Sequence, residues 1–211
     1  MDPALVLVAG ESGSGKSHLA RISGCPRFRL DEYYLDGDAP NLPQAGYGID
    51  WDHPDTWDGV GALDALEELV RTGRTVTPEY DISTSKRIGQ HEIQLPDPAP
   101  GRRIVIVAEG IFAPEIVEPA RARGLEVTGI WLYRPPPLIF LLRLVRDLRQ
   151  HRKPPIMLLR RGLALLRSEP GRRRHAQALG CTSLTMTEAR REVERLATCP
   201  SQEPPRATSS S

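Results

Sequence analysis

Eight residues near the start of the chain have the types and spacing of a phosphate-binding loop. The segment Gly10-Glu-Ser-Gly-Ser-Gly-Lys-Ser17 matches the pattern G-x-x-x-x-G-K-[ST]. The glycines let backbone N–H groups turn toward phosphate oxygens at the start of a helix. Lys16 would then reach the β- and γ-phosphates, and the Ser17 hydroxyl would bind Mg²⁺. The predicted site for ATP and Mg²⁺ consists of Gly10, Glu11, Ser12, Gly13, Ser14, Gly15, Lys16 and Ser17.

Two carboxylates follow apolar segments at points where strands of a parallel sheet would end. Asp31 comes after Phe28-Arg-Leu30, and Glu109 comes after Ile104–Ala108. Ligands bind at this carboxyl edge of open parallel sheets. Asp31 could accept the proton of an acceptor hydroxyl, or it could be a helix-capping or turn residue. Glu109 could hold the metal directly or through water, or it could be a solvated loop carboxylate.

The apolar pattern of the chain predicts the elements that would position these side chains. Two continuous apolar runs, Ala4–Ala9 and Ile104–Ala108, are typical of strands buried on both faces of a parallel sheet. Helices are predicted directly after the phosphate loop, at Asp58–Thr72, and at Thr185–Ala197, which begins with capping-box spacing. Strands that alternate with helices predict an α/β fold with a mainly parallel sheet.

Other regions are predicted to be a hairpin, a group of helices and a tail. Thr75–Tyr80 and Glu92–Leu95 have the pattern of short exposed strands separated by the polar stretch Ser83–Gln90. Beyond the prolines at 135–137, helices are expected at Leu138–His151, Pro155–Arg167 and Gly171–Leu179. Residues 1–199 are expected to form a single domain, and residues 200–211 a disordered tail.

Composition excludes several classes of function. The 211 residues carry a formal net charge of only +1, so we expect no nucleic-acid partner. The three cysteines form no Cys-x-x-Cys pair, so neither a disulfide framework nor a zinc site is predicted, and a reducing cytoplasm fits. The run Ala4–Ala9 is too short for a signal core or a membrane span. We therefore expect a cytoplasmic protein without membrane insertion, and the oligomeric state is left open.

The motifs, taken in order, resemble the uridine–cytidine kinase family, within the uridine kinase and phosphoribulokinase group of P-loop kinases. They are Gly10–Ser17, Asp31-Glu-Tyr-Tyr34, Asp52-His-Pro-Asp55, Pro78-Glu-Tyr-Asp81, Glu109-Gly-Ile111 and Arg143-Leu-Val-Arg146-Asp147. The resemblance covers about Leu5 to Arg152. It implies a mainly parallel sheet flanked by helices, a helical lid within about 138–180, and a small β-hairpin insertion.

The resemblance also implies a reaction and a role for each matching residue. The γ-phosphoryl group of ATP would pass to the 5′-hydroxyl of a nucleoside, with Asp31 as catalytic base and Lys16 on the phosphates. Ser17 and Glu109 would serve the metal. Arg143 and Arg146 would contact phosphates at the start of the lid, or else form a solvated helix face. The residues implied to bind the acceptor are Tyr34, Asp52, Tyr80, Ser85 and Arg87, with Asp52 on the ribose hydroxyls.

Two segments depart from the pattern of this family. Ser85 stands where the family usually has a histidine that contacts the pyrimidine base, so the base pocket is altered. His151-Arg-Lys-Pro-Pro155 replaces the usual Arg-Gly-Arg of the lid. The segment Ile156–Arg174 that follows is amphipathic and basic, which fits packing on the domain, packing on a second copy, or a membrane surface.

Two other functions stay open at this stage. A serine at position 85 is compatible with a kinase of a non-nucleoside alcohol, such as a pantothenate-like compound or a sugar. A phosphate loop alone would also suit a nucleotide-dependent binding module or an NTPase switch. Asp31 argues against a switch, because a switch does not need a base directed at an acceptor alcohol.

Overall fold

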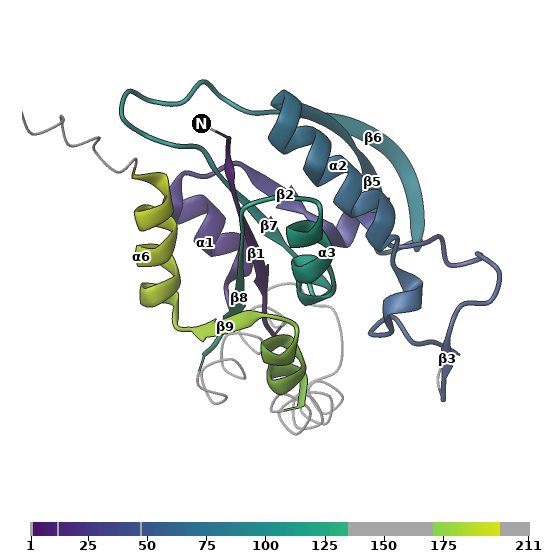
Figure 1. Cartoon of the computed structure of the whole chain (residues 1–211). Coiled ribbons are helices and arrows are strands. Elements are labelled where there is room, and N and C mark those ends of the chain that lie inside the picture. Colours follow the sequence, from purple (N-terminus) through teal and green to yellow (C-terminus); the bar gives the residue numbers. More distant parts are fainter. Residues whose placement is uncertain (1, 12, 47, 135–170, 199–211) are drawn as a thin grey trace, which may run out of the picture.

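The centre of the molecule is a five-stranded parallel sheet. The structure is a computed structural model that describes residues 2–11, 13–46, 48–134 and 171–198 (Figure 1). The strand order is β2-β7-β1-β8-β9, and every neighbouring pair is parallel. The strands are β1 (Ala4–Ala9), β2 (Arg27–Arg29), β7 (Val105–Glu109), β8 (Val127–Leu132) and β9 (Cys181–Leu184). The α/β class predicted from the sequence is confirmed.

Helices cover both faces of this sheet, which explains why β1 is apolar at every position. Val6 and Val8 pack on one face with α1 (Lys16–Ser23) and α6 (Met186–Ala197). Leu5 and Leu7 pack on the other face with α2 (Gly59–Thr72) and α3 (Val117–Ala122). Figure 1 shows these two pairs of helices on opposite sides of the strands. A strand between two helical layers has no face that needs polar side chains.

Capping residues set the ends of α2 and α6 where the sequence predicts them. The Asp58 side chain accepts a hydrogen bond from the backbone N–H of Gly61 over 2.9 Å, and α2 ends at Gly73 with φ 78°. The predicted capping box of α6 is present, with Thr185 and Glu188 exchanging hydrogen bonds. A further helix covers residues 171–178, close to the predicted Gly171–Leu179.

A separate two-stranded sheet lies beside α2 at one side of the molecule (Figure 1). It pairs β5 (Arg74–Asp81) with β6 (Lys86–Gln94) in antiparallel register. The hairpin insertion is confirmed, but its predicted strand bounds were wrong. The polar stretch Ser83–Gln90 lies largely within β6 rather than in a loop. Most residues of β6 are exposed on both faces, so the strand carries no apolar alternation by which the sequence could reveal it.

Short elements join these layers, and they place Asp31 and Glu109 slightly differently from the sequence predictions. They are η1 (Leu30–Tyr33), η2 (Pro54–Thr56), η3 (Ala113–Ile116), β3 (Gln44–Ala45) and β4 (Gly48–Ile49). Asp31 lies inside η1 rather than directly at a strand end, and Glu109 is the last residue of β7. Strand β9 was not predicted, because it is four residues long and only Cys181 is buried in it.

Several predictions fall outside the part of the chain that the structure describes. They concern the helices Leu138–His151 and Pro155–Arg167 and the tail 200–211. Within the described ranges, no helix combines the length and apolar character needed to cross a membrane.

Candidate active site

The phosphate loop connects β1 to α1 at the carboxyl edge of the sheet. Lys16 is the first residue of α1, and its Nζ donates hydrogen bonds to the carbonyls of Gly10 (2.9 Å) and Glu11 (3.4 Å). Gly15 has φ 100°, a backbone conformation that favours glycine over residues with a Cβ. The first N–H groups of a helix have no acceptor within it. The loop can therefore bind an anion.

The Ser17 hydroxyl and the Glu109 carboxylate face each other beside the loop. Ser17 Oγ donates to Glu109 Oε1 over 2.8 Å. Arg27 contacts both groups: its Nη2 donates to Ser17 Oγ (2.9 Å), and its Nε donates to Glu109 Oε1 (3.0 Å). Arg27 Nη2 also forms an ion pair with Glu109, whose side chain is 6% exposed. The guanidinium therefore offsets the cost of burying this carboxylate.

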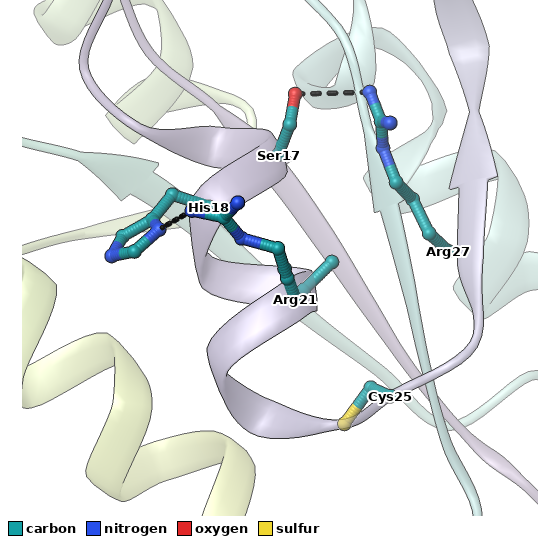
Figure 2. Close-up of a pocket in the computed structure, with 6 residues that line it drawn as sticks. Ser17, His18, Arg21, Cys25 and Arg27 are labelled. Carbon is teal, nitrogen blue, oxygen red and sulfur yellow. Dashed lines mark hydrogen bonds between the residues drawn. The ribbon is translucent and has the colours of Figure 1, made fainter.

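Figure 2 shows the same contact from the side of α1. Ser17 on α1 and Arg27 on β2 point toward each other, and both line a pocket. The other residues of its lining are His18, Ala20, Arg21 and Cys25. His18 and Arg21 contact each other on a different side of the helix, over 2.9 Å. Arg27 is therefore the basic side chain of this pocket that reaches the Ser17 hydroxyl.

The oxygens of Ser17 and Glu109 suit Mg²⁺. This ion is usually bound through one or two carboxylates together with phosphate oxygens and water. The two side chains supply oxygens 2.8 Å apart, next to the loop that would hold the phosphates. Among the residues the structure describes, no group of three or more histidine, cysteine, aspartate or glutamate side chains could hold a metal ion. The pair thus fits the protein ligands of a metal–nucleotide complex.

Asp31 lies in η1 against the end of β7. A Cβ on Gly110 would lie 2.7 Å from Leu30 Cβ and 2.8 Å from Asp31 Oδ1, so the close approach of η1 favours glycine here. Burial raises the pKa of the Asp31 carboxyl above its ordinary value of 3.8, and the charge of Glu109 raises it further. Lys16 and the backbone N–H of Ile111 act in the opposite direction. Asp31 is thus a half-buried carboxylate within electrostatic reach of the phosphate loop.

Aromatic rings surround Tyr34, close to Asp31. The ring centroid of Tyr34 lies 5.6 Å from that of Trp51, 5.8 Å from that of Tyr80 and 5.8 Å from that of Phe112. Burial raises the pKa of Tyr34, and the charges of Asp31 and Asp52 raise it further. The two carboxylates and the aromatic group therefore belong to one region. An acceptor bound in this region would meet both aromatic rings and negative charge.

Ser85 and Arg87 hold the hairpin against the segment that follows η1. Ser85 has φ 53° in the turn between β5 and β6, and its carbonyl accepts a hydrogen bond from Gly37 N over 2.7 Å. Arg87 N donates to Asp36 Oδ1 (2.8 Å), and Arg87 Nε donates to the carbonyl of Tyr34 (3.2 Å). Both residues thus support the backbone beside the aromatic group.

Asp52 lies between β4 and η2, and an arginine connects it to the phosphate loop. Its side chain is 65% exposed, and its Oδ2 lies 3.8 Å from Arg172 Nη1. Arg172 also donates two hydrogen bonds to Glu11 Oε1, of 2.9 and 2.6 Å. The predicted acceptor carboxylate and the predicted donor loop therefore share one guanidinium.

The structure brings most of the predicted site together. Lys16, Ser17, Asp31 and Glu109 gather where β1, β2 and β7 end. Tyr34, Asp52 and Tyr80 lie beside them, and Ser85 and Arg87 lie behind the aromatic group. Ser12, Arg143 and Arg146 lie outside the described residues, so their roles stay predictions.

Sequence reasoning missed four residues of this region. Trp51 stands directly before Asp52, so an aromatic side chain beside a predicted ligand was an available signal. Arg27 precedes the buried Phe28 on a strand that leads to Asp31, which is a weaker signal. No local signal in the sequence indicated the positions of Arg134 and Arg172. In the structure, Arg134 Nη2 would lie 3.0 Å from a Cβ on Gly15.

The fold and the site together define a class of protein. A parallel sheet carries a glycine-rich phosphate loop between its central strand and the first helix, and carboxylates lie at or just after the ends of two neighbouring strands. This arrangement is that of the P-loop kinases.

Comparison with known proteins identifies the family within that class. A uridine kinase of Borreliella burgdorferi is 30% identical over 149 residues, which cover 68% of this chain and 67% of the relative. A uridine kinase of Clostridium tetani is 27% identical over 156 residues, or 70% of this chain and 69% of the relative. The chain belongs to the uridine kinase family.

No family model matches the chain. Among solved structures, a gluconokinase from Sinorhizobium meliloti aligns with 93% of this chain and 94% of its own, at 16% identity and a TM-score of 0.41.

Proposed function

We propose that this chain is an ATP-dependent small-molecule kinase that phosphorylates the 5′-hydroxyl of a nucleoside. The observation that carries the proposal is the position of Asp31. This half-buried carboxylate lies against Gly110 at the end of β7 and interacts electrostatically with Lys16 of the phosphate loop and with Tyr34 of the aromatic group. A base in this position can receive the proton of an alcohol while its oxygen is aligned with the terminal phosphate. Membership of the uridine kinase family supports the same reaction.

The donor side of the site would bind ATP and Mg²⁺ through residues of the loop and β7. The metal–nucleotide complex, when bound, supplies the phosphoryl group. The loop N–H groups and Lys16 would hold its phosphates, and Ser17 with Glu109 would contact the metal. The N–H groups and Lys16 would neutralise phosphate charge, and Ser17 and Glu109 would hold the metal that does the same; charge stabilisation and positioning are the main tasks of a protein in phosphoryl transfer.

The acceptor side favours a flat molecule that carries hydroxyl groups. Tyr34, Trp51 and Tyr80 present aromatic rings suited to stacking on a base, and the exposed Asp52 carboxylate is suited to ribose hydroxyls. Ser85 favours a second candidate, a kinase of a non-nucleoside alcohol. Its side chain is shorter than histidine and cannot contact a base through an imidazole.

An acceptor panel tests the proposal directly. The protein is incubated with ATP, Mg²⁺ and, separately, uridine, cytidine, adenosine, pantothenate or a hexose, and ADP release is followed. Turnover that depends on a pyrimidine nucleoside supports the proposal, and turnover with pantothenate or the hexose alone supports the second candidate. ATP hydrolysis that needs no acceptor, or an absence of turnover with every acceptor, would contradict both.

Arg27 should affect how much Mg²⁺ the site needs. Its guanidinium bonds to the same Ser17 and Glu109 oxygens that we assign to the metal, so the two cations compete. We expect Arg27→Met to lower the half-saturating Mg²⁺ concentration roughly 3- to 10-fold. In the unchanged protein, Mg²⁺ must first break the hydrogen bond between the partly exposed Arg27 guanidinium and the Glu109 carboxylate, and in the variant it need not. The measurement is the rise in melting temperature with Mg²⁺ at fixed ADP.

A matched control for this prediction lies on the same strand. Arg29 is paired with Glu32 over 2.5 Å, so Arg29→Met also removes an ion-paired arginine from β2. This variant should keep the Mg²⁺ dependence of the unchanged protein. The same half-saturation in Arg27→Met and in the unchanged protein would show that Arg27 does not compete with the metal.

A further inference from the structure

A carboxylate is built into the phosphate loop itself. Glu11 follows Gly10 in the loop, and its side chain is only 5% exposed. A fixed negative charge at this place repels a polyphosphate, and burial strengthens the repulsion because little water screens it. Neutral residues would bind phosphate without this penalty. The protein must therefore compensate the charge of Glu11 if the loop is to bind nucleotide.

Arg172 supplies a positive charge at this carboxylate. Its Nε and Nη2 donate hydrogen bonds of 2.9 and 2.6 Å to Glu11 Oε1, across 161 positions of sequence. The Arg172 side chain is 33% exposed, so the pair lies below the fully solvated surface. Hydrogen bonds between charged groups in such surroundings are stronger than those at an open surface.

Arg172 belongs to a helix that is docked on the domain. On the helix 171–178, the Arg173 guanidinium lies 5.4 Å from the ring centre of Tyr133, and His175 Nε2 lies 2.8 Å from Glu115 Oε1. Ala176 is fully buried. Tyr133 directly follows β8, and Glu115 belongs to η3. The helix thus sets the position of Arg172. Of the basic segment Ile156–Arg174, the structure describes residues 171–174, and these pack on the domain.

The same guanidinium also faces the acceptor side. Its Nη1 lies 3.8 Å from Asp52 Oδ2, while the other nitrogens bind Glu11. Asp52 is 65% exposed, so this second contact is weak and can be replaced when a ligand arrives. The strong bond to Glu11 keeps the cation in place between the loop and the acceptor segment.

We infer that Arg172 is a positioning residue of the nucleotide site, and that it acts by neutralising Glu11. With Glu11 neutralised, the loop accepts a polyphosphate. The role of helix 171–178 is then to bring this compensating charge to the loop. The inference rests on the proposed function, since it takes the loop to be the ATP site.

Removing the two charges singly and together provides the test. The affinity for ATP with Mg²⁺ is measured by calorimetry on the full chain for Arg172→Met, Glu11→Gln and the double variant. Arg172→Met should weaken ATP binding about 10-fold or more, because the Glu11 charge then opposes the phosphates at short range. The double variant should return to within roughly 3-fold of the unchanged protein, because neither charge remains. Glu11→Gln alone should bind ATP at least as tightly as the unchanged protein.

The controls separate this role from a merely structural one. Arg190→Met removes an arginine that is likewise paired with a glutamate, Glu194 at 2.8 Å, but on α6, and it should leave ATP affinity unchanged. Unchanged affinity in Arg172→Met would overturn the inference. A double variant as weak as Arg172→Met would also overturn it, because Glu11 would not be the mediator. If the unchanged protein does not bind ATP, the proposed function itself fails.

Discussion

Replacing Asp31 with asparagine should lower kcat by about 10²- to 10⁴-fold, the usual effect of losing a general base. Asparagine keeps the shape of the side chain but cannot take the proton of the acceptor hydroxyl. ATP affinity should change little, because the loss concerns the transition state rather than nucleotide binding. The measurements are kcat with the best acceptor of the panel and the Kd of ATP. Asp64→Asn, on the exposed side of α2 and paired with Arg123 at 2.5 Å, is the matched control.

The pH dependence of turnover provides a second measurement for Asp31. The base acts in its deprotonated form, and burial raises its pKa above 3.8. Activity should therefore fall with decreasing pH through this raised pKa, at a higher pH than an exposed aspartate would give. The acid limb of kcat/KM reports this group in the free enzyme. Near-normal turnover in Asp31→Asn, or an unchanged acid limb in that variant, would rule out Asp31 as the base.

Lys16→Met should weaken ATP binding and also slow the reaction. The affinity should fall about 10- to 100-fold, since a charge-assisted contact to phosphate is lost, and kcat should fall about 10²- to 10³-fold, since the same charge stabilises the transition state. In the structure Lys16 Nζ bonds to the carbonyls of Gly10 and Glu11, so it already lies over the loop. ATP affinity and single-turnover rates measure the two effects separately.

Another lysine of the chain serves as the control for this variant. Lys86 lies in the hairpin, where it is paired with Asp38 at 2.5 Å. Lys86→Met should therefore preserve both ATP affinity and rate. A variant of Lys16 that binds ATP normally would show that the loop holds its phosphates through the backbone alone.

The sequence was most informative where a physical signal is local. The apolar runs of β1 and β7 reflect burial on two faces, and the α6 cap needs only residues three positions apart. These signals were sufficient to predict the parallel sheet and the phosphate loop within it. The length of β6 and the existence of β9 escaped prediction, because one strand is exposed on both faces and the other is very short.

In the candidate site, the contacts that could not be predicted from the sequence are those between distant parts of the chain. Asp31, Glu109 and the loop could be expected together, because strands of a parallel sheet end at one edge. No rule of spacing relates Arg172 to Glu11, or Arg27 to both Ser17 and Glu109. Arg87 matched a motif, but its contacts with Tyr34 and Asp36 depend on how the hairpin docks. Such ion pairs follow from tertiary packing and appear only once the elements are placed.

The separation of β5 and β6 from the central sheet has a consequence for how such an enzyme can evolve. The proposed donor groups lie at the edge of the five-stranded sheet, whose core tolerates few changes of volume. The hairpin has its own hydrogen-bond ladder and reaches the acceptor side through Ser85, Arg87 and Tyr80. Substitutions at its exposed positions, such as Ile88, leave the core packing intact, whereas Thr75 and Thr77 of β5 are buried. On the proposed function, a duplicated gene could thus acquire a new acceptor through substitutions at exposed positions of the hairpin, while the phosphate loop is inherited unchanged.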